Sequence, residues 1–253
     1  MHRIGLIVPS SNTTMETEIP EMLARHSQKH GTRFTFHTSR ARLHTVDIAS
    51  LARMVDDGER CAVEVGDADV DVVAYACLVA LMSRGAGAHI ATEKRFSDVI
   101  TADRGTSPPI VSSAGALART LKSLGLRKVA LVAPYMPELT RTVISYIEDS
   151  GVSVLDSVSL AVSDNLMVGR LDPAALPGYV QKLDLSGVDG IVLSACVQMP
   201  SLPAVQLVQD ATGLPVVTAA TATTREILLA LGLSPSLPNA GAALASETME
   251  AAA

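Results

Sequence analysis

The sequence has no tryptophan, few aromatic residues (3% of 253) and no run of basic residues. Proteins that bind nucleic acids need lysine and arginine to neutralise phosphates, and aromatic rings on which bases can stack. A net charge of −6 adds to this argument, so we expect no nucleic-acid partner. Hydrophobic residues make up 48% of the chain, which is too many for a disordered protein.

Long apolar runs and paired cysteines are also missing. No stretch reaches the roughly 18 apolar residues of a membrane span, and the run at Ile4–Val8 is too short for a signal peptide. The three cysteines, Cys61, Cys77 and Cys196, are an odd number, so a disulfide framework is not expected. We therefore expect a soluble, cytoplasmic protein with no membrane partner, whose thiols are buried or reactive.

The sequence also lacks the usual cofactor and metal motifs. It contains no Walker loop and no nucleophile elbow, and the glycines Gly85 and Gly87 lack the third glycine of a dinucleotide fingerprint. His26 and His30 are four residues apart in a polar segment without a third ligand, which is typical of a solvated helix face. We expect chemistry without a cofactor or metal.

Short β-branched runs alternate with longer helical patterns along the whole chain, which predicts an α/β fold with parallel sheets. The predicted strands are 4–8, 70–74, 110–111, 129–132, 152–155, 190–193 and 216–218. The clearest helices are 14–25, 47–65, 115–124, 138–150, 172–182, 205–212 and 221–231.

Three landmarks occur twice in the same order. IGLIVP at Ile4–Pro9 matches VALVAP at Val129–Pro134, and VVAYAC, ending at Cys77, matches IVLSAC, ending at Cys196. PIVSSA at 109–114 then matches PVVTAA at 215–220. We therefore predict two similar Rossmann-like halves, 1–115 and 116–220, related by a pseudo-two-fold axis, with a cleft between them. A C-terminal helix, about 221–253, would pack back on the first half.

Cys77 and Cys196 stand at the carboxyl ends of equivalent predicted strands, where open parallel sheets bind ligands. Two thiols facing one cleft would suit catalysis, and a helix N-terminus can lower a thiol pKa without a histidine. Cys61, in contrast, lies within a predicted helix and fits a small buried residue.

Polar residues follow the first strand of each half. The segment Pro9–Thr14 offers four hydroxyls and the carboxamide of Asn12 before a helix, where one residue would cap the helix and the others would face the cleft. Tyr135 follows the equivalent Pro134, so its hydroxyl could bind a carboxylate. Asn165, by position alone, needs no role beyond a turn.

Three segments, PSSN at Pro9–Asn12, YAC at Tyr75–Cys77 and SAC at Ser194–Cys196, resemble those of the maleate cis-trans isomerases. This family belongs to the aspartate/glutamate racemase superfamily, with hydantoin racemase and arylmalonate decarboxylase as relatives. The similarity covers nearly the whole chain and is greatest to the isomerases of bacterial nicotinate degradation. Decarboxylases of the superfamily have one cysteine, so the second thiol argues against that activity.

The resemblance implies isomerisation of maleate to fumarate through a succinyl-cysteine intermediate, in a homodimer. Cys77 matches the nucleophile of the family, and Cys196 matches its second catalytic cysteine, described as the proton donor. The other implied positions bind substrate, with side chains or backbone: Asn12, Leu78, Val79, Tyr135, Asn165, Val197 and Gln198.

Two alternatives stay open from the sequence. A two-thiol amino-acid or hydantoin racemase would use both cysteines to move a proton between the faces of a Cα atom. A two-lobed dicarboxylate-binding protein would close on the same ligand without chemistry.

Overall fold

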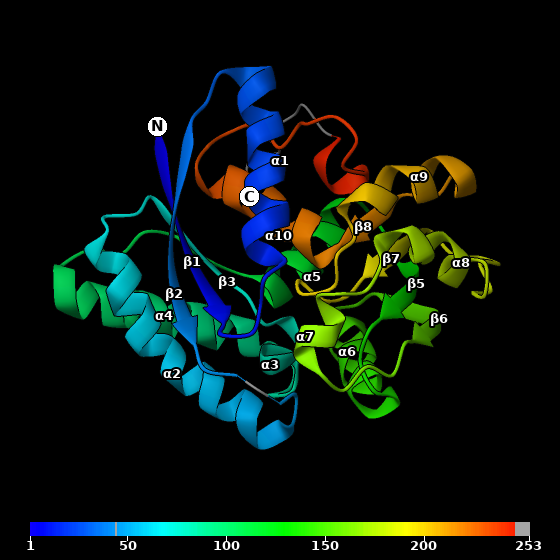
Figure 1. The fold of residues 1–253 in the computed structure, drawn as a ribbon, viewed down its shortest axis with the longest axis horizontal. Helices are drawn as coiled ribbons and strands as arrows, with labels where there is room; N and C mark the ends of the chain where they lie inside the picture. The colour runs from blue at the N-terminus through cyan, green and yellow to red at the C-terminus, as the bar shows by residue number, and fades with distance from the viewer. Residues whose placement is uncertain (44, 246–253) are drawn as a thin grey trace.

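The computed structural model describes residues 1–43 and 45–245 and shows two parallel sheets of the same topology (Figure 1). Within that range the first sheet has four strands in the order β2-β1-β3-β4, and the second has four in the order β6-β5-β7-β8. The predicted α/β fold with two similar halves is confirmed. We use first half and second half for the parts built on these two sheets.

The strands are short and their central members are almost completely buried. Their bounds are β1 His2–Pro9, β2 Phe34–Ala41, β3 Val72–Tyr75, β4 Ile110–Ser112, β5 Lys128–Ala133, β6 Ser153–Ser159, β7 Gly190–Ser194 and β8 Val216–Thr218. Parallel strands covered by helices on both faces bury both sides, which explains the continuous runs of valine, isoleucine and alanine.

The helices run between the strands and cover the sheets. Their bounds are α1 Met15–His30, α2 Ile48–Asp67, α3 Leu78–Met82, α4 Ala88–Arg104, α5 Ser113–Ser123, α6 Pro137–Asp149, α7 Asn165–Val168, α8 Leu176–Val180, α9 Leu202–Thr212 and α10 Ala219–Ala230. The described residues also form two 3₁₀ turns, which are η1 Pro173–Ala175 and η2 Ala242–Leu244. In the first half, α2 and α4 contact each other on one face of the sheet, whereas α1 and α10 contact each other on the opposite face.

Strand β2 is absent from the sequence prediction. It is an edge strand that pairs only with β1, and polar residues such as His37 and Arg40 interrupt its apolar pattern. Only Ser39 and Ala41 are buried in it, so it carries little of the hydrophobic signal that identifies the central strands. Helix α4 was missed for a similar reason, because it buries only Thr92, Phe96 and Ile100 along 17 residues.

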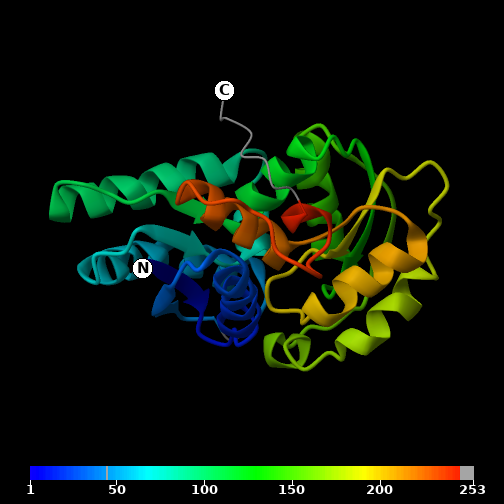
Figure 2. The ribbon, with the colours of Figure 1, turned by 90° about the horizontal axis from the view of Figure 1, so that it is seen from above.

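Helix α10 (Ala219–Ala230) corresponds to the helix predicted at 221–231, and the described part of the C-terminal segment 221–253 is not one continuous helix. Helix α10 ends at Ala230, because Gly232 adopts a φ of 69° and Pro235 and Pro238 cannot continue a helix. The following chain carries only the short η2, and residues 246–253 lie outside the described residues. Helix α10 itself contacts α1 and α5 and the strands β3 and β4, and Figure 2 shows it running over the first half.

The interpretation of His26 as part of a solvated helix face is also wrong. The side chain is 1% exposed, its ring lies 4.4 Å from that of His30, and its Nε2 contacts the carbonyl oxygen of Ser234 at 3.0 Å. The segment after α10 folds back over α1 and covers His26, a contact between residues more than 200 positions apart, whereas His30 stays exposed.

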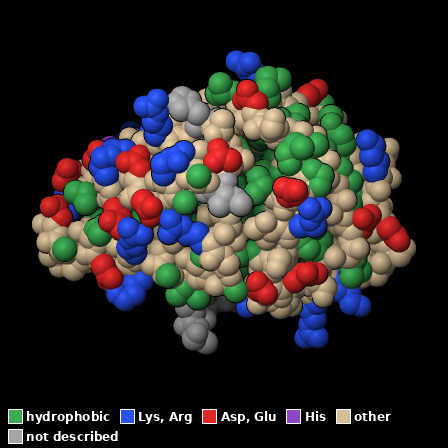
Figure 3. Space-filling model, turned by 90° about the horizontal axis from the view of Figure 1, so that it is seen from below, with side chains coloured by type: hydrophobic (Ala, Val, Ile, Leu, Met, Phe, Trp, Pro, Cys, Tyr) green, Lys and Arg blue, Asp and Glu red, His purple; other side chains and the backbone are tan. Residues whose placement is uncertain are grey.

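In the part of the chain that the structure describes, no helix is both long and apolar enough to cross a bilayer. On one face of the molecule (Figure 3), the two halves differ in the side chains that they expose. Figure 3 shows charged side chains spread over the first half and hydrophobic side chains gathered over the second. Exposed large apolar residues of the second half include Met136, Leu155, Leu166 and Met167.

Candidate active site

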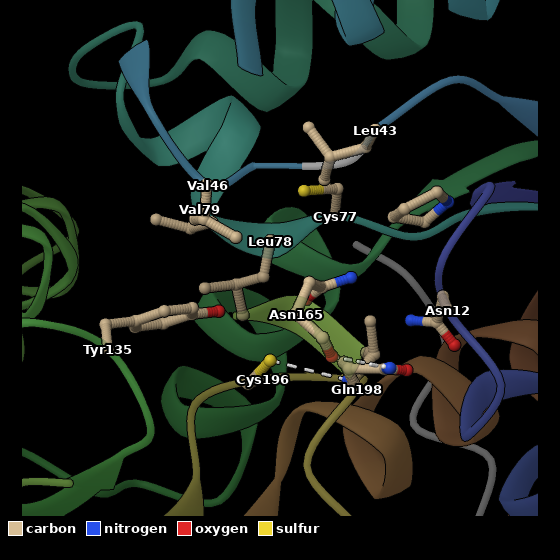
Figure 4. A pocket seen from close by; sticks show the side chains of 12 residues that line it. Asn12, Leu43, Val46, Cys77, Leu78, Val79, Tyr135, Asn165, Cys196 and Gln198 are labelled. Atoms are coloured by element: carbon tan, nitrogen blue, oxygen red, sulfur yellow. Dashed lines mark hydrogen bonds between the residues drawn. The ribbon is translucent and has the colours of Figure 1, made fainter. Parts of the chain in front are cut away.

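One small pocket lies between the halves, at the carboxyl ends of β1, β3, β5 and β7 (Figure 4). Its cavity is about 20 Å³, hardly more than the space of one water molecule. All the predicted site residues line this pocket: Asn12, Cys77, Leu78, Val79, Tyr135, Asn165, Cys196, Val197 and Gln198. Pro9, Leu43 and Val46 complete its wall.

Leu43 and Val46 are the lining residues that sequence reasoning missed. They belong to the connection from β2 to α2, in which Thr45 forms an antiparallel bridge to Asp164 of the second half. Because β2 itself was not predicted, no sequence pattern placed this connection over the pocket.

Cys77 lies at a strained point of the backbone. It follows β3 and directly precedes α3, with φ 133° and ψ 80°, a left-handed conformation that non-glycine residues rarely adopt. The side chain is 7% exposed. Burial raises the pKa of the Cys77 thiol to about 12, although the backbone N–H of Ala80 in α3 stabilises the thiolate.

Cys196 follows β7 in the second half and is equally buried, at 6% exposed. Figure 4 shows the two thiols on opposite sides of the pocket. Burial raises the pKa of the Cys196 thiol, and three donors oppose that rise: the Tyr135 hydroxyl and the backbone N–H groups of Gln198 and Met199. The Gln198 N–H lies 3.4 Å from the sulfur. The environments of the two thiols are therefore different, and Cys196 has more donors around it.

Tyr135 is buried beside Cys196, with 5% of its surface exposed. Its hydroxyl donates to the carbonyl oxygen of Ala195 at 3.2 Å. Burial holds the pKa of this phenol well above its usual range, so it stays protonated and could donate to an anion in place of the Ala195 carbonyl oxygen.

Asn12 combines the two roles that the sequence left as alternatives. Its Oδ1 accepts a hydrogen bond from the backbone N–H of Met15 at 3.0 Å, which stabilises the first turn of α1. Its Nδ2 is buried and has no partner. An unpartnered buried donor in a pocket wall is costly unless a ligand pairs with it, so Asn12 is suited to bind an anionic group.

The hydroxyls next to Asn12 do not face the pocket, contrary to prediction. Ser10 and Ser11 bond to the backbone of Leu43, and Thr14 donates to the carbonyl oxygen of Gln198 at 2.7 Å. They hold neighbouring segments together, and within Pro9–Thr14 only Pro9 and Asn12 line the pocket.

Asn165 is the first residue of α7 rather than a turn residue. It is 7% exposed, and its Nδ2 donates to Ser11 Oγ at 2.7 Å across the two halves. The pocket wall thus consists of neutral donors, apolar side chains and two thiols, with no lysine or arginine among its residues. Among the described residues, no group of three or more His, Cys, Asp or Glu could hold a metal ion.

Comparison with known proteins assigns the family. The family model for arylmalonate decarboxylase matches residues 4–244. A maleate isomerase of Geobacillus stearothermophilus is 53% identical over 246 residues, which cover 97% of this chain and 98% of that protein. The chain belongs to the maleate isomerase family.

Two solved structures of maleate isomerases match with nearly complete coverage. A cysteine-to-alanine variant of the isomerase Iso from Pseudomonas putida S16, with maleate, is 47% identical, with a TM-score of 0.94 over 96% of this chain and 97% of that one. A cysteine-to-serine variant of the Nocardia farcinica maleate cis-trans isomerase carries a covalently bound succinylcysteine intermediate. It is 43% identical, with a TM-score of 0.93 over 98% of this chain and 99% of that one.

Proposed function

We infer that the protein is a maleate cis-trans isomerase that converts maleate to fumarate through a succinyl-cysteine intermediate. The observation that carries this proposal is the pair of buried thiols on opposite sides of one small pocket, walled by neutral hydrogen-bond donors. Membership of the maleate isomerase family supports the substrate.

The chemical problem is the carbon–carbon double bond, about which maleate cannot rotate thermally. In the proposed first step the Cys77 thiolate adds to C2 of maleate, and the π electrons move to C3, where the adjacent carboxylate delocalises them. The Cys196 thiol gives its proton to C3, which leaves a succinyl thioether on Cys77 and a thiolate on Cys196. A covalent intermediate divides one difficult step into easier ones.

In the adduct C2–C3 is a single bond and can rotate. The Cys196 thiolate then removes a proton from C3, the C–S bond breaks, and fumarate leaves with its new double bond. The Cys77 thiolate and the Cys196 thiol are regenerated, so the reaction is balanced without an oxidant, reductant or cofactor.

Neutral donors would hold the two carboxylates and the charge that develops next to C3. Asn12 Nδ2 and the Tyr135 hydroxyl are suitable donors, together with the backbone around Leu78, Val79 and Val197. Donors that are already oriented stabilise a developing anion without reorganisation, in the way of an oxyanion hole. The apolar wall keeps water away from the carbanion.

The isomerase assay follows maleate and fumarate by proton NMR with the purified protein. Growth of the fumarate olefin signal is expected, and no exchange or inversion should occur with aspartate or a hydantoin. Inversion of an amino acid without loss of maleate would instead favour the two-thiol racemase. Binding of maleate without turnover would favour the non-catalytic binding protein.

We further propose that the protein is a cytoplasmic homodimer. The exposed apolar side chains of the second half, such as Leu155 and Met167, support a protein interface there. Light scattering coupled to size exclusion should give twice the chain mass of 26.4 kDa.

A further inference from the structure

Gln198 lies next to the catalytic thiol pair, but its side chain is fully occupied by the protein itself. Its Nε2 donates to the carbonyl oxygens of Ser11 at 3.1 Å and Asn165 at 2.9 Å. Its Oε1 accepts from the backbone N–H groups of Thr13 at 3.0 Å and Thr14 at 3.4 Å. These four contacts use both donors and both lone pairs of the amide.

The contacts of this one side chain join the two halves. Ser11, Thr13 and Thr14 belong to the loop between β1 and α1 in the first half, whereas Asn165 begins α7 in the second. The residue is 2% exposed, so water cannot replace a lost bond. With no free donor or acceptor, the side chain cannot bind a substrate carboxylate.

The backbone of the same residue touches the thiol. The Gln198 N–H lies 3.4 Å from Cys196 Sγ, and the Gln198 carbonyl oxygen accepts from Thr14 Oγ1 at 2.7 Å. The side chain and the backbone of Gln198 therefore both connect the loop that carries Cys196 to the loop between β1 and α1.

We propose that Gln198 is a positioning residue, whose side-chain amide fixes the Cys196 thiol relative to the first half and to Cys77. This role of Gln198 rests on the proposed isomerase function, to which it adds a residue that positions one of the two thiols. Gln198 would act through Cys196 rather than through substrate contact, so its loss should lower kcat more than it raises KM.

Gly169 provides a second way to disturb the same amide. A Cβ atom at Gly169 would lie 2.5 Å from Gln198 Nε2, the far end of a flexible side chain, which would have to move. Gly169 has a φ of −68°, so alanine fits its backbone without strain. Gly169→Ala therefore displaces the amide while leaving Gln198 in place.

The test compares Gln198→Met and Gly169→Ala with two matched controls. Gln206→Met removes a glutamine whose amide bonds only to Asp210, one turn further along α9. Gly178→Ala adds a Cβ with nothing within 4 Å. We expect kcat to fall about 10- to 100-fold in Gln198→Met and less in Gly169→Ala, with KM changed less than about threefold. Both controls should stay within about twofold of the parent.

A second measurement does not depend on isomerase activity. The rate of alkylation of Cys196 by iodoacetamide, read by mass spectrometry across pH, reports the ionisation of that thiol. The backbone N–H groups of Gln198 and Met199 lower the pKa of Cys196, so displacing them should shift its alkylation profile to higher pH. The profile of Cys77 should move less, and neither control should move either profile.

The two hypotheses fail in different ways. A parent protein that does not isomerise maleate would refute the proposed function, while the alkylation profile still tests Gln198. An unchanged Cys196 profile in both Gln198→Met and Gly169→Ala would overturn the positioning role, even if kcat falls. A rise in KM at constant kcat would also overturn it, since that is the result expected of a substrate contact.

Discussion

At the scale of single residues, the two cysteines occupy equivalent places in the repeat but different environments. Cys77 has a strained backbone at the start of α3, and Cys196 has the Tyr135 hydroxyl and backbone donors near its sulfur. A strained, fixed backbone suits a nucleophile that must attack from one direction. Hydrogen-bond donors near a thiol stabilise its thiolate, which suits a group that gives up a proton and later takes it back. The structure thus supports distinct roles for the two.

We expect Cys77→Ala to abolish turnover, because it removes the thiol that forms the carbon–sulfur bond in the proposed mechanism. Cys196→Ser should accumulate a succinyl adduct on Cys77, since a serine hydroxyl is a poor base for removing the C3 proton. Mass spectrometry of acid-quenched protein with maleate locates the adduct. Cys61→Ala, at a buried position in α2, is the control. An adduct on Cys196 would reverse the two roles.

Turnover should increase with pH. Burial raises the pKa of both thiols, that of Cys77 to about 12, so each is mostly neutral near pH 7. The thiolate fraction then grows about tenfold per pH unit below the pKa. Initial rates measured between about pH 6 and pH 9 at constant ionic strength should therefore rise. A flat profile would contradict this prediction and would mean that the thiols ionise differently once the substrate is bound.

Asn12→Ser separates the two roles of Asn12. A serine hydroxyl can still accept the N–H at the start of α1, but the unpartnered Nδ2 donor is lost. We expect kcat/KM to fall by about 10- to 150-fold, the equivalent of about 1.5–3 kcal/mol, with little change in Tm.

Asn12→Ala removes the helix contact as well, and should cost about 1 kcal/mol more in stability. Kinetics and thermal melts on both variants check this. Unchanged kcat/KM in Asn12→Ser would show that Asn12 only caps the helix.

At the scale of elements, Glu18 connects helix α1 of the first half to helix α9 of the second half. Its carboxylate is 6% exposed and accepts from the N–H groups of Ser201 at 2.6 Å and Leu202 at 2.7 Å. These are orphan donors at the start of α9, which has no side-chain cap of its own. Helix α1 thus caps a helix 183 residues away along the chain.

Burial raises the pKa of Glu18 above its usual value, so the folded state binds its proton more tightly than the unfolded state. The stability of the parent should therefore decrease as pH rises from about 4.5 through the raised pKa. Glu18→Gln keeps an acceptor oxygen but cannot ionise. We expect its Tm, relative to the parent, to increase with pH between about 4 and 8.

Thermal melts across this range check the Glu18 prediction. Glu21→Gln, on the exposed side of α1 where Glu21 pairs with Arg25, is the control and should show no such trend. A Glu18→Gln variant that loses stability relative to the parent as pH rises would show that the ionised carboxylate is the favoured form.

At the scale of the whole molecule, the halves share too many contacts to be independent. Helix α10 follows the last strand of the second half yet packs on α1 and α5 and contacts β3 of the first. Glu18 and Gln198 add buried hydrogen bonds between the halves. Each half alone would leave apolar surface and polar groups uncovered.

We therefore expect one cooperative unfolding transition. Differential scanning calorimetry should give a calorimetric enthalpy equal to the van't Hoff enthalpy calculated for a folded dimer that unfolds to two chains, the mark of a two-state process. Two resolved transitions would show that the halves unfold separately.

The α/β class, the two similar halves and the strand ends that carry the thiols could all be predicted from the amino-acid sequence. These features are local: buried parallel strands need β-branched runs, and each thiol directly follows such a run. Family motifs also lie in these short segments, so the resemblance identified the pocket residues. The pattern was weakest where burial is one-sided, which is why β2 and α4 escaped prediction.

The contacts that each side chain makes, in contrast, depend on the tertiary structure. Leu43 and Val46 close the pocket, and the amide of Asn12 bonds to the start of α1 with its oxygen and faces the cavity with its nitrogen. The side-chain amide of Gln198 bonds only to other parts of the protein. The contacts of Gln198 and Glu18 join residues up to 187 positions apart. No local pattern encodes them, because a hydrogen bond between two halves depends on how the sheets are placed relative to one another.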